Sequence, residues 1–293
     1  MFQGTYAPIP TPFNAGGEID WKALQDNLRW WGQTPLQGIV FGGTNGEAAL
    51  LDHDEKVKAF AFTRENLPAE KAVIVGTGCE SARATDNLNR AAADGGADAV
   101  LILNPSYFKG NLSDEVLHNY YLHVAENSTL PVILYNMPRN TGLNLSAKLV
   151  CSLSTHPNIV GLKDSSGNIV QLGEVINDCG ADFSVLAGSA GIMLPALLLG
   201  ASGGILALAN IMPEECVSIT TLYKEGKLER AKDLQLSLLE INYAVTVRWG
   251  VAGLKAALDM LGHYGGPPRL PLLPLNDTEK EQLADIMKQC GLL

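Results

Sequence analysis

The sequence lacks any apolar stretch of the roughly 20 residues that a transmembrane helix needs. It also lacks a cluster of basic residues. The 21 Lys and Arg residues are outnumbered by 31 Asp and Glu residues, which gives a formal net charge of −10. An acidic protein repels nucleic acid and anionic membranes. We therefore expect neither of these partners.

Cysteine is scarce and shows no pairing pattern. The five cysteines are odd in number and widely spaced, and no C-x-x-C occurs. The chain begins MFQGTYAPIPTPF, which has neither the basic and apolar regions of a secretory signal nor the Arg-rich pattern of a transit peptide. We expect reduced, buried thiols in a cytoplasmic protein.

Short apolar runs, many of them β-branched, recur along the chain up to residue 208. Continuous apolar runs of this length are typical of strands that are buried on both faces, as in a parallel sheet. We predict eight strands, at residues 5–10, 38–41, 72–76, 99–103, 131–136, 159–163, 183–187 and 203–208.

Helical patterns separate these runs and continue after them. They cover residues 19–31, 52–66, 81–94, 113–127, 146–153, 169–176, 192–199, 214–224, 227–247, 251–261 and 278–289. Strand–helix alternation repeated about eight times predicts an α/β fold, a (β/α)8 TIM barrel with a C-terminal helical extension. We place the catalytic barrel at residues 1–224 and the extension at 225–293. The alternative, a doubly wound sheet, often has a glycine fingerprint in its first turn, which GTYAPIPTPF lacks.

Lys163 ends one predicted strand, directly after the apolar residues IVGL. In a TIM barrel the active site lies where strands end and loops begin. Burial there disfavours the ammonium form of a lysine, and a neutral amine can attack a ketone to form a Schiff base. The alternative is a structural lysine that pairs with the adjacent Asp164.

Tyr135, Thr44 and Asn45 lie at two other strand ends. The phenol of Tyr135 can relay a proton, or the ring can be a core aromatic whose hydroxyl is satisfied. Thr44 and Asn45 belong to the turn GGTNGE, and glycine-rich turns expose backbone amides that suit a carboxylate or a phosphate.

Metal catalysis lacks support in the sequence. The five histidines fall mostly in or beside predicted helices, and none shows a ligand spacing such as H-x-x-x-H. We expect no catalytic metal and no other cofactor.

Together, the strand-end motifs resemble those of the dihydrodipicolinate synthase/N-acetylneuraminate lyase family, which are pyruvate-dependent class I aldolases. GGTNGE is similar to the family's G-[ST]-[TN]-G-E loop, YNMPRNTG to its Y-N-x-P-x-x-T-G segment, and VGLKDSSG to its Schiff-base lysine segment. The three motifs occur in the family's order and spacing, and the similarity covers nearly the whole chain.

The resemblance implies a role for each matching residue. Lys163 would form the imine with pyruvate, and Tyr135 would shuttle the proton and polarise the carbonyl. Thr44 and Asn45 would hold the pyruvate carboxylate, and Thr44 would link Tyr135 to Tyr107 in a hydroxyl relay. Tyr107 resembles a tyrosine that enters a neighbouring subunit's site in some members, so we expect a homo-oligomer, a dimer or a tetramer.

Further positions concern the rest of the pocket. Gly188 and Ile205 would line it through backbone groups. Synthases of the family carry an arginine at the position of Asn140, where it binds the carboxylate of the aldehyde, whereas here an arginine lies one residue earlier, at Arg139. An asparagine at position 140 is closer to 4-hydroxy-2-oxoglutarate aldolase, in which the serine that matches Ser165 meets the second carboxylate.

We therefore expect reversible cleavage of 4-hydroxy-2-oxoglutarate to pyruvate and glyoxylate. One alternative is 4-hydroxy-tetrahydrodipicolinate (dihydrodipicolinate) synthase activity, which condenses pyruvate with aspartate semialdehyde. Another is the cleavage of a 2-keto-3-deoxy sugar acid. A non-enzymatic alternative is a sensor of 2-oxo acids on the same fold, although a sensor has no need of Lys163, Tyr135 and Thr44 together.

Overall fold

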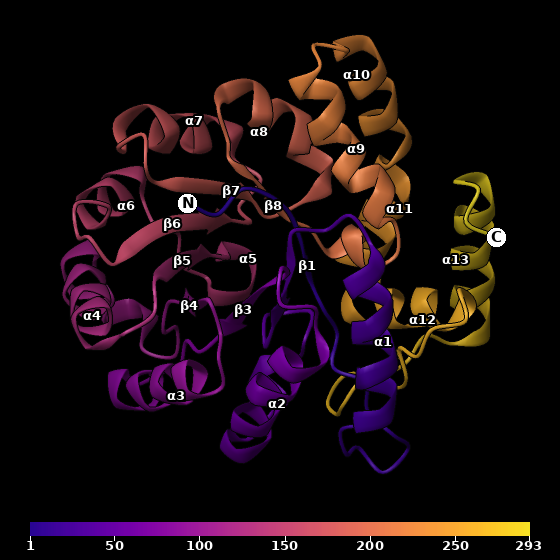
Figure 1. The fold of residues 1–293 in the computed structure, drawn as a ribbon, viewed down its shortest axis with the longest axis horizontal. Coiled ribbons are helices and arrows are strands. Elements are labelled where there is room, and N and C mark those ends of the chain that lie inside the picture. Colours follow the sequence, from indigo (N-terminus) through magenta and orange to yellow (C-terminus); the bar gives the residue numbers. More distant parts are fainter.

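The computed structural model describes residues 1–293 and contains a closed barrel of eight parallel strands (Figure 1). Each strand pairs with the next along the chain, and β8 closes the barrel against β1. The strands are β1 (Gly4–Pro8), β2 (Gly38–Phe41), β3 (Ala72–Gly76), β4 (Ala99–Leu103), β5 (Val132–Asn136), β6 (Ile159–Asp164), β7 (Ser184–Ala187) and β8 (Gly203–Ile205).

Helices surround the barrel, which confirms the predicted (β/α)8 TIM-barrel fold (Figure 1). Those of the barrel are α1 (Trp21–Gln33), α2 (His53–Asn66), α3 (Ala82–Asp94), α4 (Asp114–Asn127), α5 (Pro138–Thr141), α6 (Ala147–Leu153), α7 (Ile169–Asp178), α8 (Met193–Leu199) and α9 (Pro213–Lys224). Those that follow are α10 (Leu228–Ser237), α11 (Leu239–Tyr243), α12 (Gly250–Met260) and α13 (Asp277–Gln289). Figure 1 shows α12 near α1 at one side of the barrel, with α13 farther out against α12.

Alternate strand residues face two separate cores. The smaller core fills the barrel interior and includes Ile133, Tyr135, Leu186 and Ile205, whereas the larger lies between the strands and the helices and includes Leu162. Because successive side chains of a strand point to opposite faces, Lys163 faces the interior when Leu162 faces the helices. The strand pleat therefore directs the lysine toward Tyr135.

Polar caps begin several helices. Asp52 caps α2 through a capping box, in which its side chain accepts a hydrogen bond from the backbone N–H of Glu55 and the Glu55 side chain accepts one from the backbone N–H of Asp52. Ser81, Ser113 and Ser146 cap α3, α4 and α6 through their hydroxyl oxygens, each of which accepts one backbone N–H, without the reciprocal bond of a capping box. A cap satisfies N–H groups that the first helical turn leaves unpaired, so these boundaries are encoded locally.

The seam between β8 and β1 depends on a glycine. A Cβ atom at Gly203 would lie 2.0 Å from the carbonyl oxygen of Gly4, its pairing partner. Any larger residue would push the two strands apart, so glycine permits the close approach that closes the barrel.

Two element predictions were wrong. Residues 227–247 do not form one helix, because α10 ends at Ser237, α11 is short and Ala244–Arg248 form a π-helix. No glycine or proline marks this break, and the segment buries Ile241 and Val245 against the larger core. The last strand is also shorter than predicted, because Ala207–Asn210 form a 3-10 helix in which the Asn210 side chain donates to the carbonyl of Pro8.

The cysteines differ in part from expectation. All five are free thiols, but only Cys216 is buried, and the others are half-buried. No helix combines the length and the apolar character needed to cross a membrane.

Candidate active site

Lys163 and Tyr135 lie side by side at the ends of β6 and β5. The strand register pairs the two residues directly. Both side chains are buried, and the Lys163 Nζ lies over the Tyr135 ring, 4.1 Å from its centroid. The site therefore combines an amine and a phenol at the mouth of the barrel, where catalytic groups of this fold gather.

The predicted alternative for Lys163, an ion pair with Asp164, does not occur. No carboxylate lies within ion-pair distance of Lys163. Asp164 faces the helix side, where Oδ2 accepts a hydrogen bond from the Asn136 side chain at 2.9 Å and Oδ1 accepts one from the Ser166 backbone at 2.8 Å. The buried carboxylate is thus satisfied by neutral donors and leaves the amine free.

Tyr135 is tied to the glycine-rich turn. Its hydroxyl lies 3.1 Å from the Thr44 Oγ1, within hydrogen-bond distance. Burial acts to raise the pKa of Tyr135, but the Lys163 charge and hydrogen bonding with Thr44 and Ser165 outweigh it, so the pKa is lowered from the usual value of a phenol. A phenol with a lowered pKa gives up and regains its proton more readily, which suits a proton relay.

Ser165 and Gly188 meet across the ends of β6 and β7. The backbone N–H of Gly188 donates to the carbonyl of Asp164 at 2.7 Å. A Cβ atom at Gly188 would lie 2.0 Å from the Ser165 Oγ, so only glycine leaves room for the serine hydroxyl there. The structure therefore brings Ser165 and Gly188 to the mouth that holds Lys163.

Asn45 and Ile205 occupy different depths of the site region. Asn45 is half-buried in the turn after β2, and its side chain forms no hydrogen bond within the chain. Ile205 is fully buried in the barrel interior, in the same core as Tyr135. The asparagine side chain is therefore available to a ligand, whereas the isoleucine is packed in the interior core.

Two predicted site residues stand apart from this group within the single chain. Tyr107 is 80% exposed, and its ring packs edge-on against Phe108 rather than approaching Thr44. Asn140 is exposed on the one-turn helix α5, and no hydrogen bond involves its side chain. Neither residue contributes to the Lys163–Tyr135–Thr44 group inside one protomer.

Arg139 contacts the π-helix Ala244–Arg248. Its guanidinium donates to the backbone carbonyls of Thr246 and Val247, both at 3.4 Å, in the π-helix. Bonds of this length are weak. The arginine shifted by one residue is therefore held loosely against the C-terminal helices, outside the hydrogen bonds of the site.

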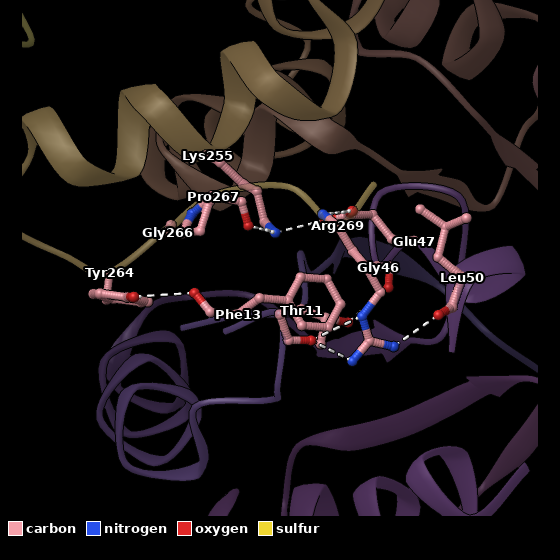
Figure 2. Close-up of polar contacts among 12 residues, drawn as sticks. Thr11, Phe13, Gly46, Glu47, Leu50, Lys255, Tyr264, Gly266, Pro267 and Arg269 are labelled. Atoms are coloured by element: carbon pink, nitrogen blue, oxygen red, sulfur yellow. Dashed lines mark hydrogen bonds and ion pairs between the residues drawn. The ribbon is translucent and has the colours of Figure 1, made fainter. Parts of the chain in front are cut away.

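Sequence reasoning missed the group that holds the glycine-rich turn. Glu47 is the single non-glycine residue with a positive φ, 56°, and its carboxylate is buried. Its Oε1 accepts from the Lys255 Nζ at 2.5 Å, and its Oε2 accepts from the Arg269 backbone N–H at 2.8 Å (Figure 2). Lys255 also donates to the carbonyl of Pro267. An acidic residue closing a glycine-rich turn was the signal for this group.

Arg269 also contacts segments outside the turn. Its guanidinium donates to the carbonyl of Leu50 (Figure 2). It also donates to the carbonyl of Gly17 and forms an ion pair with Glu55. Burial lowers the pKa of Lys255, although the neighbouring Glu47 acts in the opposite direction. The C-terminal segment thus fixes the backbone that carries Thr44 and Asn45.

No group of three or more His, Cys, Asp and Glu side chains is arranged to hold a metal ion. The groups that the structure brings together are a buried amine, a phenol and a hydroxyl, beside a glycine-rich turn.

The sequence matches the dihydrodipicolinate synthetase family over residues 1–290. The chain belongs to this family. It is accordingly an enzyme of the class I pyruvate aldolase type, and the sensor alternative is not retained.

Relatives in the family resemble the chain along its whole length. The 4-hydroxy-tetrahydrodipicolinate synthase of Geobacter metallireducens is 36% identical over 293 residues, which is 100% of both chains. Dihydrodipicolinate synthase from Thermotoga maritima superposes with a TM-score of 0.95 at 29% identity and full coverage of both chains. A prophage protein of the family from E. coli K12, in complex with pyruvate, gives a TM-score of 0.94 at 30% identity, again over 100% of both chains.

The Glu47–Lys255 pair predicts a large effect on stability. Lys255→Met should lower the free energy of unfolding by about 3–5 kcal/mol, because the Glu47 carboxylate would remain buried without its cation. The double variant Glu47→Gln/Lys255→Met should be less destabilised than Lys255→Met, since no charge is then left unpaired. Urea unfolding followed by circular dichroism measures both changes.

Lys232→Met is the matched control, because Lys232 pairs with Glu229 at the exposed surface. Surface pairs contribute about 0–1 kcal/mol, so this variant should unfold close to the wild type. If Lys255→Met proved no more destabilising than Lys232→Met, the buried pair would not hold the turn.

Proposed function

We propose that Lys163 forms a Schiff base with the ketone of pyruvate or of a larger 2-oxo acid. The observation that carries this proposal is the buried Lys163 amine, which lies over Tyr135 with no carboxylate to pair with. An amine in such a place can attack a ketone carbon. The pyruvate complex of the related E. coli protein adds support from outside the chain.

The proposed chemistry follows from the imine. The Lys163 amine adds to C2 of the 2-oxo acid, and loss of water leaves an iminium that withdraws electrons from C3. In cleavage, the C4 hydroxyl loses its proton, the C3–C4 bond breaks, the aldehyde leaves, and the electron pair forms an enamine that then gains a proton at C3. In condensation, C3 loses a proton, the enamine attacks the aldehyde, and the new alkoxide gains a proton. Water then hydrolyses the iminium and releases the product from Lys163.

The neighbouring residues have distinct proposed roles. Tyr135 carries protons between the intermediates, and Thr44 orients its hydroxyl from 3.1 Å. Thr44 and Asn45 hold the carboxylate of pyruvate on the rigidly anchored turn. Gly188 and Ile205 line the pocket, and the Ser165 hydroxyl, which fits only because residue 188 is glycine, faces the second substrate.

Trapping with borohydride tests the central proposal. Wild-type protein treated with pyruvate and sodium borohydride should gain one reduced pyruvate adduct, located at Lys163 by peptide mass spectrometry. Lys163→Ala should gain none and should lose turnover while keeping its circular dichroism spectrum. An adduct at another lysine, or an undiminished adduct in the variant, would remove Lys163 from the mechanism.

Tyr135→Phe separates imine formation from proton transfer in the same assay. It should still be trapped by borohydride, but more slowly, and kcat should fall about 10²–10⁴-fold, the usual contribution of a positioned acid–base group. A kcat close to that of the wild type would make Tyr135 a core aromatic instead.

For the second substrate, the first candidate is aspartate semialdehyde. Relatives that match the whole chain, at 35–36% identity, are named 4-hydroxy-tetrahydrodipicolinate synthase. This name supports a synthase reaction, the condensation of pyruvate with the semialdehyde. Because residue 140 is Asn, the carboxylate of the semialdehyde would need Arg139, whose weak bonds to Thr246 and Val247 can be released.

A second candidate, cleavage of 4-hydroxy-2-oxoglutarate, is favoured by a specific observation. Asn140 offers only neutral hydrogen bonds, and the Arg139 guanidinium is already engaged with the backbone carbonyls of Thr246 and Val247. Without an arginine at position 140, the carboxylate of the aldehyde loses a charge-assisted hydrogen bond, which costs on the order of 1.5–3 kcal/mol of binding free energy. This loss weakens aldehyde binding more in a synthase than in an aldolase, whose smaller aldehyde is held close to the reacting carbon.

Kinetic comparison separates the two candidates. The synthase proposal expects kcat/KM for semialdehyde condensation to exceed that for pyruvate release from 4-hydroxy-2-oxoglutarate. It also expects Arg139→Ala to lower semialdehyde condensation roughly 10- to 150-fold, the value of one charge-assisted bond. Asn140→Arg should raise condensation in either case and shows whether position 140 reaches the substrate. Faster cleavage that is insensitive to Arg139→Ala would favour the second candidate.

We also propose that the protein assembles into a homo-oligomer. Tyr107 and Phe108 form an adjacent pair of aromatic rings that are 80% and 68% exposed. Exposed aromatic pairs favour association, so they support a homo-oligomer in which Tyr107 approaches a neighbouring subunit. A cytoplasmic location stays a prediction.

Light scattering should give a mass about two or four times that of the 31.2-kDa chain. Phe108→Glu should shift the protein toward smaller species because a buried carboxylate disrupts the contact. Val170→Glu, at a residue equally exposed (68%) on α7, should leave the mass unchanged. A monomeric wild type would contradict the proposal.

A further inference from the structure

Two thiols meet on the outside of the barrel, away from the site. Cys151 lies in α6, and Cys179 directly follows α7. Their Sγ atoms are 2.8 Å apart. Both residues are half-buried, so small reagents can reach them.

At this separation the sulfur atoms of the two free thiols are in direct contact. A disulfide bond is about 2.0 Å long, so the two sulfur atoms would have to move closer by less than about 1 Å to form one. The other three cysteines, Cys79, Cys216 and Cys290, have no sulfur atom as a contact partner. The closeness of Cys151 and Cys179 is therefore specific to this pair.

We propose that Cys151 and Cys179 form a reversible disulfide bond in the presence of a low-molecular-weight disulfide such as oxidised glutathione. One cysteine thiolate attacks the glutathione disulfide and displaces a first glutathione. The second cysteine attacks the mixed disulfide and displaces the other glutathione. The two cysteines together lose two electrons and two protons, and both glutathiones leave reduced.

The position of the pair predicts a structural effect rather than a catalytic one. Both cysteines lie toward the carboxyl ends of their helices, which in a (β/α)8 barrel is the face opposite the strand ends that carry Lys163 and Tyr135. The bond joins α6 to α7 and closes a loop that contains β6. Closing a loop reduces the freedom of the unfolded chain and so stabilises the fold.

The reaction is expected to be slow at neutral pH. Burial, together with the neighbouring Cys179, raises the pKa of Cys151 to about 12. Disulfide exchange requires a thiolate, so the rate should increase as the pH is raised from 7 to 9.

Incubation of the whole protein with oxidised glutathione at pH 8.5 tests the proposal. Two thiols should disappear in thiol titration of the unfolded protein, and peptide mass spectrometry should show one cross-link, between Cys151 and Cys179. The midpoint of thermal unfolding should rise by about 5 °C. Dithiothreitol should reverse both changes, and aldolase activity should stay within twofold.

Two variants make the result decisive. Cys151→Ser should leave Cys179 able to form only a mixed disulfide with glutathione, with no cross-link and no rise in the unfolding midpoint. Cys290→Ser, at another half-buried cysteine, should behave like the wild type. Retention of both thiols, glutathione adducts without a cross-link in the wild type, or a cross-link to Cys290 would overturn the proposal.

Discussion

The pairing register of β5 and β6 is the constraint on which the site depends. It sets Tyr135 beside Lys163, and the pleat turns both into the barrel. A slip of one residue would move Lys163 to the helix side and bring Asp164 inward. The hydrogen bonds from Asn136 and Ser166 to Asp164 oppose such a slip, because the carboxylate would lose both of them on turning inward. Because the Asp164 carboxylate is hydrogen-bonded on the outer side, the Lys163 amine has no carboxylate partner.

A second constraint joins the two ends of the sequence. The turn after β2 must present Thr44 to Tyr135, yet its own glycines give it little rigidity. The buried carboxylate of Glu47 supplies that rigidity through Lys255 and the backbone of Arg269. The helices that follow the barrel therefore contribute to the site, because Lys255 of α12 holds the turn through Glu47.

The motifs that show the family and the residues that we propose to select the second substrate lie in different parts of the molecule. Family membership rests on the barrel and its strand-end motifs, which match over nearly the whole chain. The residues that we propose to select the second substrate, Asn140 and Arg139, are exposed and lie on the one-turn helix after β5. Loops tolerate changes that strands do not, so proteins with one barrel can use different aldehydes.

The sequence by itself determined the eight strands, most of the helices and the residues at the strand ends. Those features are local: apolar runs, caps such as Asp52 and short motifs need only neighbouring residues. The sequence did not decide whether Lys163 pairs with Asp164 or stays without a carboxylate partner.

Only the tertiary structure decided which distant groups meet. Glu47 and Lys255 are 208 positions apart, and Cys151 and Cys179 are 28 apart with β6 between them. The break after α10 belongs with them, since packing against the larger core rather than a glycine or proline ends that helix. Such contacts arise from the closure of the barrel, which no short stretch of sequence encodes.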